Sequence, residues 1–120
     1  MPNNLISVEV ASKMTALYRQ EMPTILDYPF MEENILPICE TFDRTAFDAL
    51  LDQEGCTSVR IYYGMSDDRK IHAIVVGVNS DNEDILPETS IAGLSGSDTV
   101  IIEEAFRCPD YCPPKSPLNS

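Results

Sequence analysis

The sequence is poor in positive charge. It has 8 lysine and arginine residues against 20 acidic residues, which gives a formal net charge of −12. The excess is spread along the chain, because residues 1–55 carry −7 and residues 56–120 carry −5. Such a field repels the phosphates of nucleic acids and anionic membranes, so neither class of partner is expected. The even spread also favours a folded domain with an acidic surface over a disordered acidic arm.

Long apolar segments are missing as well. No run approaches the ~20 residues that a bilayer-spanning helix needs. The first residues, MPNNLISVEV, lack the basic and apolar regions of a secretory leader. We therefore expect a cytoplasmic protein whose thiols are reduced.

The usual motifs of enzymes and ligand sites are also absent. The sequence has no glycine-rich phosphate loop, no GxSxG and no basic patch with interleaved aromatic residues. The acidic segment 79–90 does not fit a calcium-binding EF-hand loop, because Asp84 and Ser90 occupy the positions of the required glycine and glutamate. A solvated turn is the simpler interpretation.

His72 is the only histidine of the chain. A catalytic histidine needs a nucleophile or a carboxylate held beside it, and the sequence shows only Arg60, Tyr62 and Tyr63 as neighbours on an adjacent strand. We therefore expect a structural histidine and no catalytic residues.

At 120 residues and 43% hydrophobic content, the chain fits one domain, residues 1–120. Ser7 can cap a helix over 8–20, in which Val10, Met14 and Leu17 fall at helical spacing. A second helix is expected over 43–54, capped by Thr41 or Asp43 and followed by Gly55. Its apolar stripe comprises Phe42, Ala46, Phe47, Leu50 and Leu51.

Two strands are predicted at 56–64 and 70–78, joined by the polar turn 65–69. A second turn leads to a short strand at Ile85–Leu86 and then to a loop at 87–98. The segment 99–107 is ambiguous, because its β-branched residues favour a strand while its apolar spacing favours a helix. We favour the helix. The expected fold is α+β, with two or three helices packed on an antiparallel β-meander.

Two proline-interrupted segments flank this core. Residues 21–40 form an extended connector that carries Tyr28 and Phe30. We expect it to lie over the core, because its large apolar residues would be costly to expose. Residues 108–120, CPDYCPPKSPLNS, form a tail that contains a PxxP motif. We expect an ordered, docked tail anchored by Tyr111 and Leu118, and the predicted interface residues are Tyr28, Phe30, Tyr111, Pro113, Pro114, Pro117 and Leu118.

The tail also contains Cys108 and Cys112. Structural zinc needs four ligands, so these two cysteines require further ligands from Cys39, Cys56 or His72. A disulfide between them closes a small loop and adds little entropic stabilisation. We favour two small buried thiols and no cofactor, with zinc as the alternative.

The combination GCxxxRIYYG, HAIVVGV and a terminal CPxYC with SPLN resembles a set of small bacterial proteins of unknown function. The matching positions are Gly55, Cys56, Arg60 to Gly64, His72 to Val78, Cys108, Cys112 and Ser116 to Asn119. The resemblance covers roughly the second half of the chain and implies no catalytic residues. It implies only that the hairpin and the tail belong to one architectural unit.

These observations favour a non-enzymatic module for protein interaction or self-assembly. Such a module binds a protein partner or a second copy of itself, and in the second case it forms a homo-oligomer. Two other hypotheses remain. One is an acidic inhibitor or immunity-type protein that neutralises a basic partner. The other is a zinc-binding domain or metal-dependent enzyme that uses Cys108 and Cys112.

Overall fold

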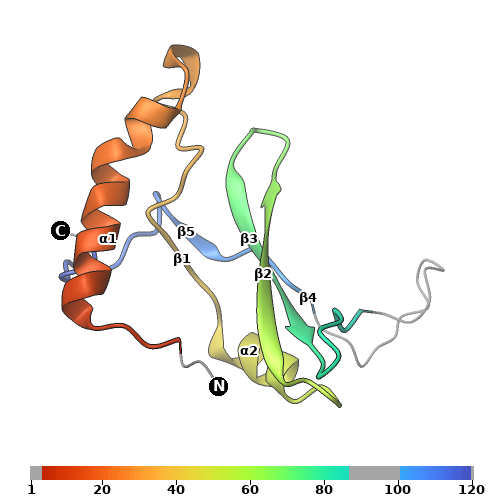
Figure 1. The fold of residues 1–120 in the computed structure, drawn as a ribbon. Helices are drawn as coiled ribbons and strands as arrows, with labels where there is room; N and C mark the ends of the chain where they lie inside the picture. The colour runs from red at the N-terminus through yellow and green to blue at the C-terminus, as the bar shows by residue number, and fades with distance from the viewer. Residues whose placement is uncertain (1–3, 87–100, 120) are drawn as a thin grey trace. The chain divides into compact units, whose positions relative to one another are not determined.

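The fold combines two α-helices with short antiparallel strands in the residues that the structure, a computed structural model, describes: 4–86 and 101–119 (Figure 1). The predicted α+β class is confirmed. The elements are α1 (Val8–Glu21), two 3₁₀ helices (Met22–Ile25 and Tyr28–Phe30), β1 (Cys39–Thr41), α2 (Arg44–Leu51), β2 (Ser58–Met65), β3 (Ile71–Val78), β4 (Ile101–Ile102) and β5 (Phe106–Cys108).

The chain forms two compact units. The helical unit contains α1, both 3₁₀ helices and the C-terminal segment, and its described residues are 4–39 and 107–119. The sheet unit contains α2, β2, β3 and β4, within 40–86 and 101–106. The chain passes from one unit to the other within β1 and again within β5, which pair as a two-stranded sheet. The single domain predicted from the chain length stays a prediction.

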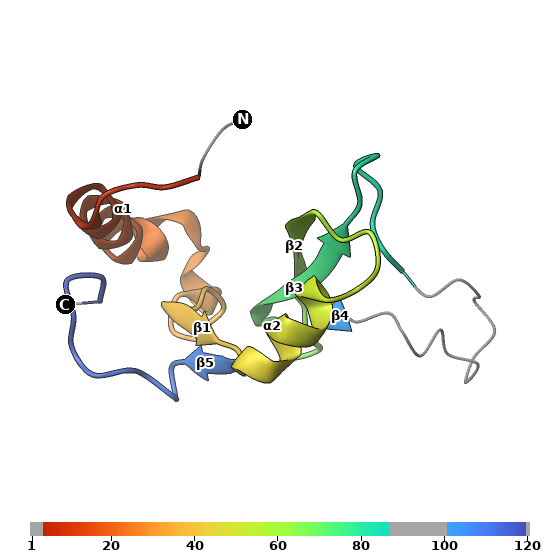
Figure 2. The same cartoon turned by 90° about the horizontal axis from the view of Figure 1, so that it is seen from below.

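The sheet unit is built on the β2–β3 hairpin, which confirms the two predicted strands. The two strands are antiparallel from Ser58 opposite Val78 to Met65 opposite Ile71, and β4 adds to the other side of β3. Helix α2 packs against β3 and β4 (Figure 2). The buried core comprises Leu50, Val75 and Ile102, with Phe42, Ala46, Phe47 and Cys56 packed around it.

Helix α2 forms for the local reasons that the sequence indicates. The Asp43 carboxylate accepts a hydrogen bond from the Thr45 N–H at 3.1 Å, which satisfies one of the free donors at the helix start. The helix ends at Leu51, and Gly55 lies in the turn that is closed by the hydrogen bond from the Cys56 N–H to the Gln53 carbonyl. With φ at +81°, Gly55 adopts a conformation that side chains disfavour, although it is not the residue that caps the helix.

The helical unit is held together by hydrogen bonds that the backbone of residues 35–38 accepts and donates. Tyr18 on α1 donates to the Pro37 carbonyl at 2.6 Å, and the Ile38 N–H donates to the Cys108 carbonyl at 2.8 Å. Arg107 donates from Nη2 to the Ile35 carbonyl at 2.6 Å. This segment therefore joins α1 and β5 through polar contacts.

The connector 21–40 is less extended than expected. It contains the two 3₁₀ helices, and each has a proline at its first or second position, where the missing N–H costs nothing. Ile35 is buried, but Ile25 and Tyr28 are exposed. The expectation that all the large apolar residues of this segment lie against the core is therefore wrong.

The helix predicted within 99–107 is also wrong. Residues 101–102 and 106–108 are strands, and Glu104 between them has φ at +66°, which no right-handed helix contains. Ile102 lies opposite Val75 and enters the core beside Leu50. Long-range strand pairing of β-branched residues therefore outweighs the helical spacing.

The predicted strand Ile85–Leu86 is replaced by a single bridge. Asp84 lies opposite Val78, and the Ile85 N–H donates to the Gly77 carbonyl at 2.8 Å. The turn before it is closed by Asn79, whose side-chain oxygen accepts from the N–H groups of Asp81 and Glu83. The loop predicted at 87–98 lies outside the described residues.

Candidate functional site

The structure joins Cys108 and Cys112 in a disulfide, with 4.6 Å between their Cα atoms. We had favoured two free thiols at these positions, and that expectation is overturned. Cys39 and Cys56 are free. A disulfide supplies no thiolate, which is the form of cysteine that binds zinc.

Metal ligation finds no support in the described part of the chain. Within residues 4–86 and 101–119, no three His, Cys, Asp or Glu side chains are grouped so that they could hold a metal ion. Cys108 and Cys112 belong to the helical unit, whereas Cys56 and His72 belong to the sheet unit. Zinc stays an alternative that metal analysis of the purified protein would decide.

His72 has a carboxylate neighbour that sequence reasoning missed. Its Nδ1 lies 3.5 Å from Glu40 Oε2 and 3.9 Å from Glu103 Oε2, both longer than a good hydrogen bond. Glu40 is largely buried, and its other oxygen accepts from the Ala73 N–H at 2.9 Å. No local pattern could have indicated this contact, because it brings together residues far apart in the sequence.

The surroundings of His72 lack a visible nucleophile among the described residues. A cavity of about 100 Å³ beside it is lined by Ser66, Ile74 and Glu103, among others. The Ser66 hydroxyl hydrogen-bonds to the Asp68 carboxylate and not to His72. The pair of His72 and Glu40 can orient an imidazole, but it has no partner to activate.

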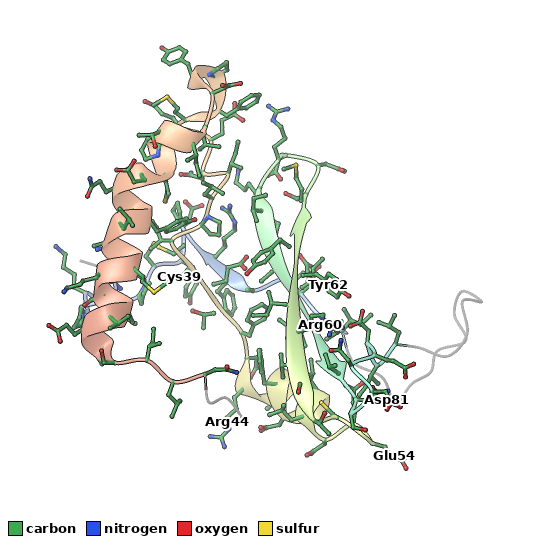
Figure 3. All side chains as sticks on the ribbon, in the orientation of Figure 1. Cys39, Arg44, Glu54, Arg60, Tyr62 and Asp81 are labelled. Atoms are coloured by element: carbon green, nitrogen blue, oxygen red, sulfur yellow. A yellow bond between two sulfur atoms is a disulfide. The ribbon has the colours of Figure 1, made fainter. Side chains whose placement is uncertain are left out.

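A cluster of four polar residues lies farther from the hairpin turn than His72 does. We call it the Arg60 cluster, and its members are Arg60, Tyr62, Asn82 and Asp84. Arg60 bonds Asp84 at 2.5 Å through Nη1 and the Asn82 side-chain oxygen at 2.5 Å through Nη2. The Tyr62 hydroxyl donates to the other oxygen of Asp84. Figure 3 shows Arg60 and Tyr62 along β2, and Asp81 in the turn that follows β3.

The Arg60 cluster closes one face of the sheet. Arg60 lies opposite Val76 and Asp84 lies opposite Val78, and opposite residues project from the same face. Both valines are buried, and the cluster lies beside them on the same face of the sheet. Sequence reasoning could not pair Arg60 with Asp84 without the hairpin register, because they are 24 residues apart. We conclude that these polar groups are structural.

The cluster makes the stability of the sheet unit sensitive to acid. The Tyr62 hydrogen bond, followed by the Arg60 contacts, holds the pKa of Asp84 below its ordinary value of 3.8, and the same bond raises the pKa of Tyr62. A lowered carboxyl pKa stabilises the folded state at pH values above 3.8, and this contribution disappears as the pH falls through the folded-state pKa.

We therefore expect Asp84→Asn to lower the urea concentration at the unfolding midpoint at pH 7. Below the folded-state pKa of Asp84, where the wild-type carboxyl is protonated, the two proteins should have the same midpoint. The measurement is urea unfolding at pH 7, 4 and 2 for both proteins. Asp81→Asn in the same turn is the matched control, because the described contacts of Asp81 involve its backbone N–H. An equal loss for Asp84→Asn at every pH would contradict the assignment.

Large apolar side chains are exposed on two elements. On α1, none of the 14 residues is buried, and Met14, Leu17 and Met22 line an open groove of about 330 Å³. The helix that the apolar spacing predicts is therefore confirmed, but its apolar stripe is exposed within the helical unit. On β2, Val59, Ile61 and Met65 are exposed, and Tyr63 is 77% exposed.

The predicted interface residues are mostly exposed. Tyr28, Tyr111, Pro113, Pro114, Pro117 and Leu118 are exposed, and Phe30 is half-buried. Arg19 donates to the Leu118 carbonyl at 2.7 Å, which is a backbone contact of the tail with α1. Because Tyr111 and Leu118 remain exposed, their role as anchors requires a further surface and stays a prediction.

Comparison with family models, with curated proteins and with solved structures finds no match to this chain. No helix within the described residues combines the length and the apolar character needed to cross a bilayer.

Proposed function

We propose that this protein is a non-enzymatic self-assembly module that associates with a second copy of itself. The observation that carries the proposal is the concentration of exposed apolar side chains on α1 and β2. Each unit carries its own set of these side chains, on α1 in the helical unit and on β2 in the sheet unit. Large exposed apolar patches are rare on monomeric proteins and mark protein interaction sites. The side chains of the two sets are Val10, Met14, Leu17 and Ile25 on or next to α1, and Val59, Ile61, Tyr63 and Met65 on β2.

The polar groups support an interaction role over a catalytic one. The Arg60 cluster uses its charges on one another, and His72 with Glu40 lacks a nucleophile among the described residues. The exposed tail residues Tyr111 and Leu118 offer further apolar contacts for the same association.

The net charge of −12 supports a second candidate, an acidic protein that neutralises a basic partner. Such a protein attracts its partner by long-range electrostatics, so the complex weakens as salt is added. Apolar self-association depends much less on salt, and the two functions therefore separate in one experiment.

The test is the mass of the purified chain by light scattering across a dilution series, at low and at high salt. We expect a mass of two or more chains that persists at high salt and falls to that of one chain only on strong dilution. A mass of one chain, 13.4 kDa, at every concentration would refute self-assembly and favour the acidic-partner hypothesis.

A further inference from the structure

Strand β2 has an open edge. The sheet order is β2, β3, β4, so β3 occupies one side of β2 and no strand of the described residues occupies the other. At eight residues, β2 matches β3 as the longest strand described. An exposed edge of this length presents unpaired N–H and C=O groups, which are a template for another strand.

The register shows which backbone groups face outward. The Ser66 N–H donates to the Lys70 carbonyl at 3.0 Å, so these two residues form a hydrogen-bonded pair at the turn end of the hairpin. Along an antiparallel ladder, hydrogen-bonded pairs alternate with pairs that are not hydrogen-bonded. The even-numbered residues of β2 therefore bond β3. The odd-numbered residues, Val59, Ile61, Tyr63 and Met65, direct their backbone groups to the open edge.

The same odd-numbered residues share one face of the sheet and are all apolar and exposed. Natural edge strands are usually protected by lysine, proline or an inward charge. Strand β2 contains neither lysine nor proline, and its only charge, on Arg60, is bound by Asp84 and Asn82. Within residues 4–86 and 101–119, the edge is therefore unprotected.

Charge indicates which partner fits the edge. Two copies of a chain with a net charge of −12 repel each other over most of their surfaces. The segment Ser58–Met65, SVRIYYGM, contains no acidic residue. It is thus a place where two copies can approach with little repulsion, and an antiparallel strand is complementary to itself across a two-fold axis.

We infer that β2 pairs antiparallel with β2 of a second copy, with the two-fold axis at Ile61. This inference rests on the proposed self-assembly and names its seam. Ile61 then lies opposite Ile61 of the second copy, and Val59 lies opposite Tyr63, which makes a continuous apolar strip. Arg60 lies opposite the Tyr62 ring, an arrangement that favours a cation over an aromatic face. Centring the axis on Tyr62 instead would place Arg60 opposite Gly64.

The first experiment compares two substitutions of exposed residues by light scattering. Ile61→Lys introduces a charge at the axis, where it meets its own copy, and should reduce the mass to that of one chain. Leu51→Lys on α2 is the matched control, because Leu51 is also half exposed but lies outside the proposed surface, and it should leave the wild-type mass unchanged. Circular dichroism melting checks that both variants remain folded.

The second experiment reads the register directly. Opposite hydrogen-bonded residues have Cα atoms about 5.5 Å apart, within the range of a disulfide. Ile61→Cys should therefore form a covalent dimer on mild oxidation, whereas Asp67→Cys in the exposed hairpin turn, six residues from the axis along each chain, should not. The wild type, with its free Cys39 and Cys56, is the blank.

The outcomes separate the two proposals. A wild-type chain that is monomeric at every concentration refutes both of them. A wild-type assembly that survives Ile61→Lys and gives no dimer with Ile61→Cys overturns the β2 seam but leaves self-assembly standing. A folded, monomeric Ile61→Lys variant together with an Ile61→Cys dimer supports the seam.

Discussion

Replacing Leu50 with alanine should lower the free energy of unfolding of the sheet unit by about 2–5 kcal/mol. Leu50 is fully buried on α2, where it contacts the two other buried core residues, Val75 and Ile102. Its loss removes apolar burial and leaves a cavity that the surrounding strands fill only in part. A unit of this size has little stability to spare, so the loss is a large share of the total.

The measurement is urea unfolding of the wild type and the variant, followed by far-ultraviolet circular dichroism. Leu51→Ala is the matched control, because Leu51 is the next residue of the same helix and is 50% exposed. We expect the control to cost less than about 1 kcal/mol. Equal losses for the two variants would show that α2 does not turn Leu50 towards the sheet.

Local signals predicted the elements that depend on local chemistry. Ser7 and Asp43 each accept a hydrogen bond from the backbone N–H groups at the start of a helix, and these caps set the beginnings of α1 and α2. The strands of the hairpin were predicted from their β-branched and aromatic residues. The stripe that contains Leu50 identified the core face of α2, except for Leu51, which it also included and which is 50% exposed.

The two main errors have different physical causes. The spacing within 99–107 fits a helix, but Ile102 pairs with Val75 from another part of the chain. The disulfide of Cys108 and Cys112 was geometrically open from the spacing, and we ranked it below free thiols because of an assumed reducing environment. The strand depends on a partner that is distant in the sequence, whereas the disulfide depends on the redox environment as well as on a spacing that the sequence shows.

The division into two units also left no local signal. A boundary between units usually coincides with a glycine-rich or polar linker. Here it falls within β1 and β5, which are short paired strands with ordinary strand residues. Of the candidate interface, only the tail and the connector residues could be proposed from the sequence, and both stay predictions. The tail aromatic and proline residues stand out in the sequence, whereas the open edge of β2 exists only once the strand order is known.

Replacing Arg107 with alanine should destabilise the helical unit by about 1.5–3 kcal/mol, the usual contribution of a hydrogen bond to a charged donor. Arg107 is buried on β5, and its Nη2 donates at 2.6 Å to the carbonyl of Ile35, which is itself buried. Without this donor, the carbonyl loses a charge-assisted bond in a place that water reaches poorly. The connector and β5 then lose a side-chain link between them.

Two further measurements distinguish this bond from simple packing. Arg107→Met keeps most of the volume of the side chain, so it should lose nearly as much stability as alanine if the hydrogen bond dominates. Burial raises the pKa of Tyr18, and the charge of Arg107 partly opposes that rise. Both variants should therefore shift the ultraviolet titration of Tyr18 to still higher pH. Wild-type stability in Arg107→Met, with an unchanged Tyr18 titration, would show that only the aliphatic part of Arg107 matters.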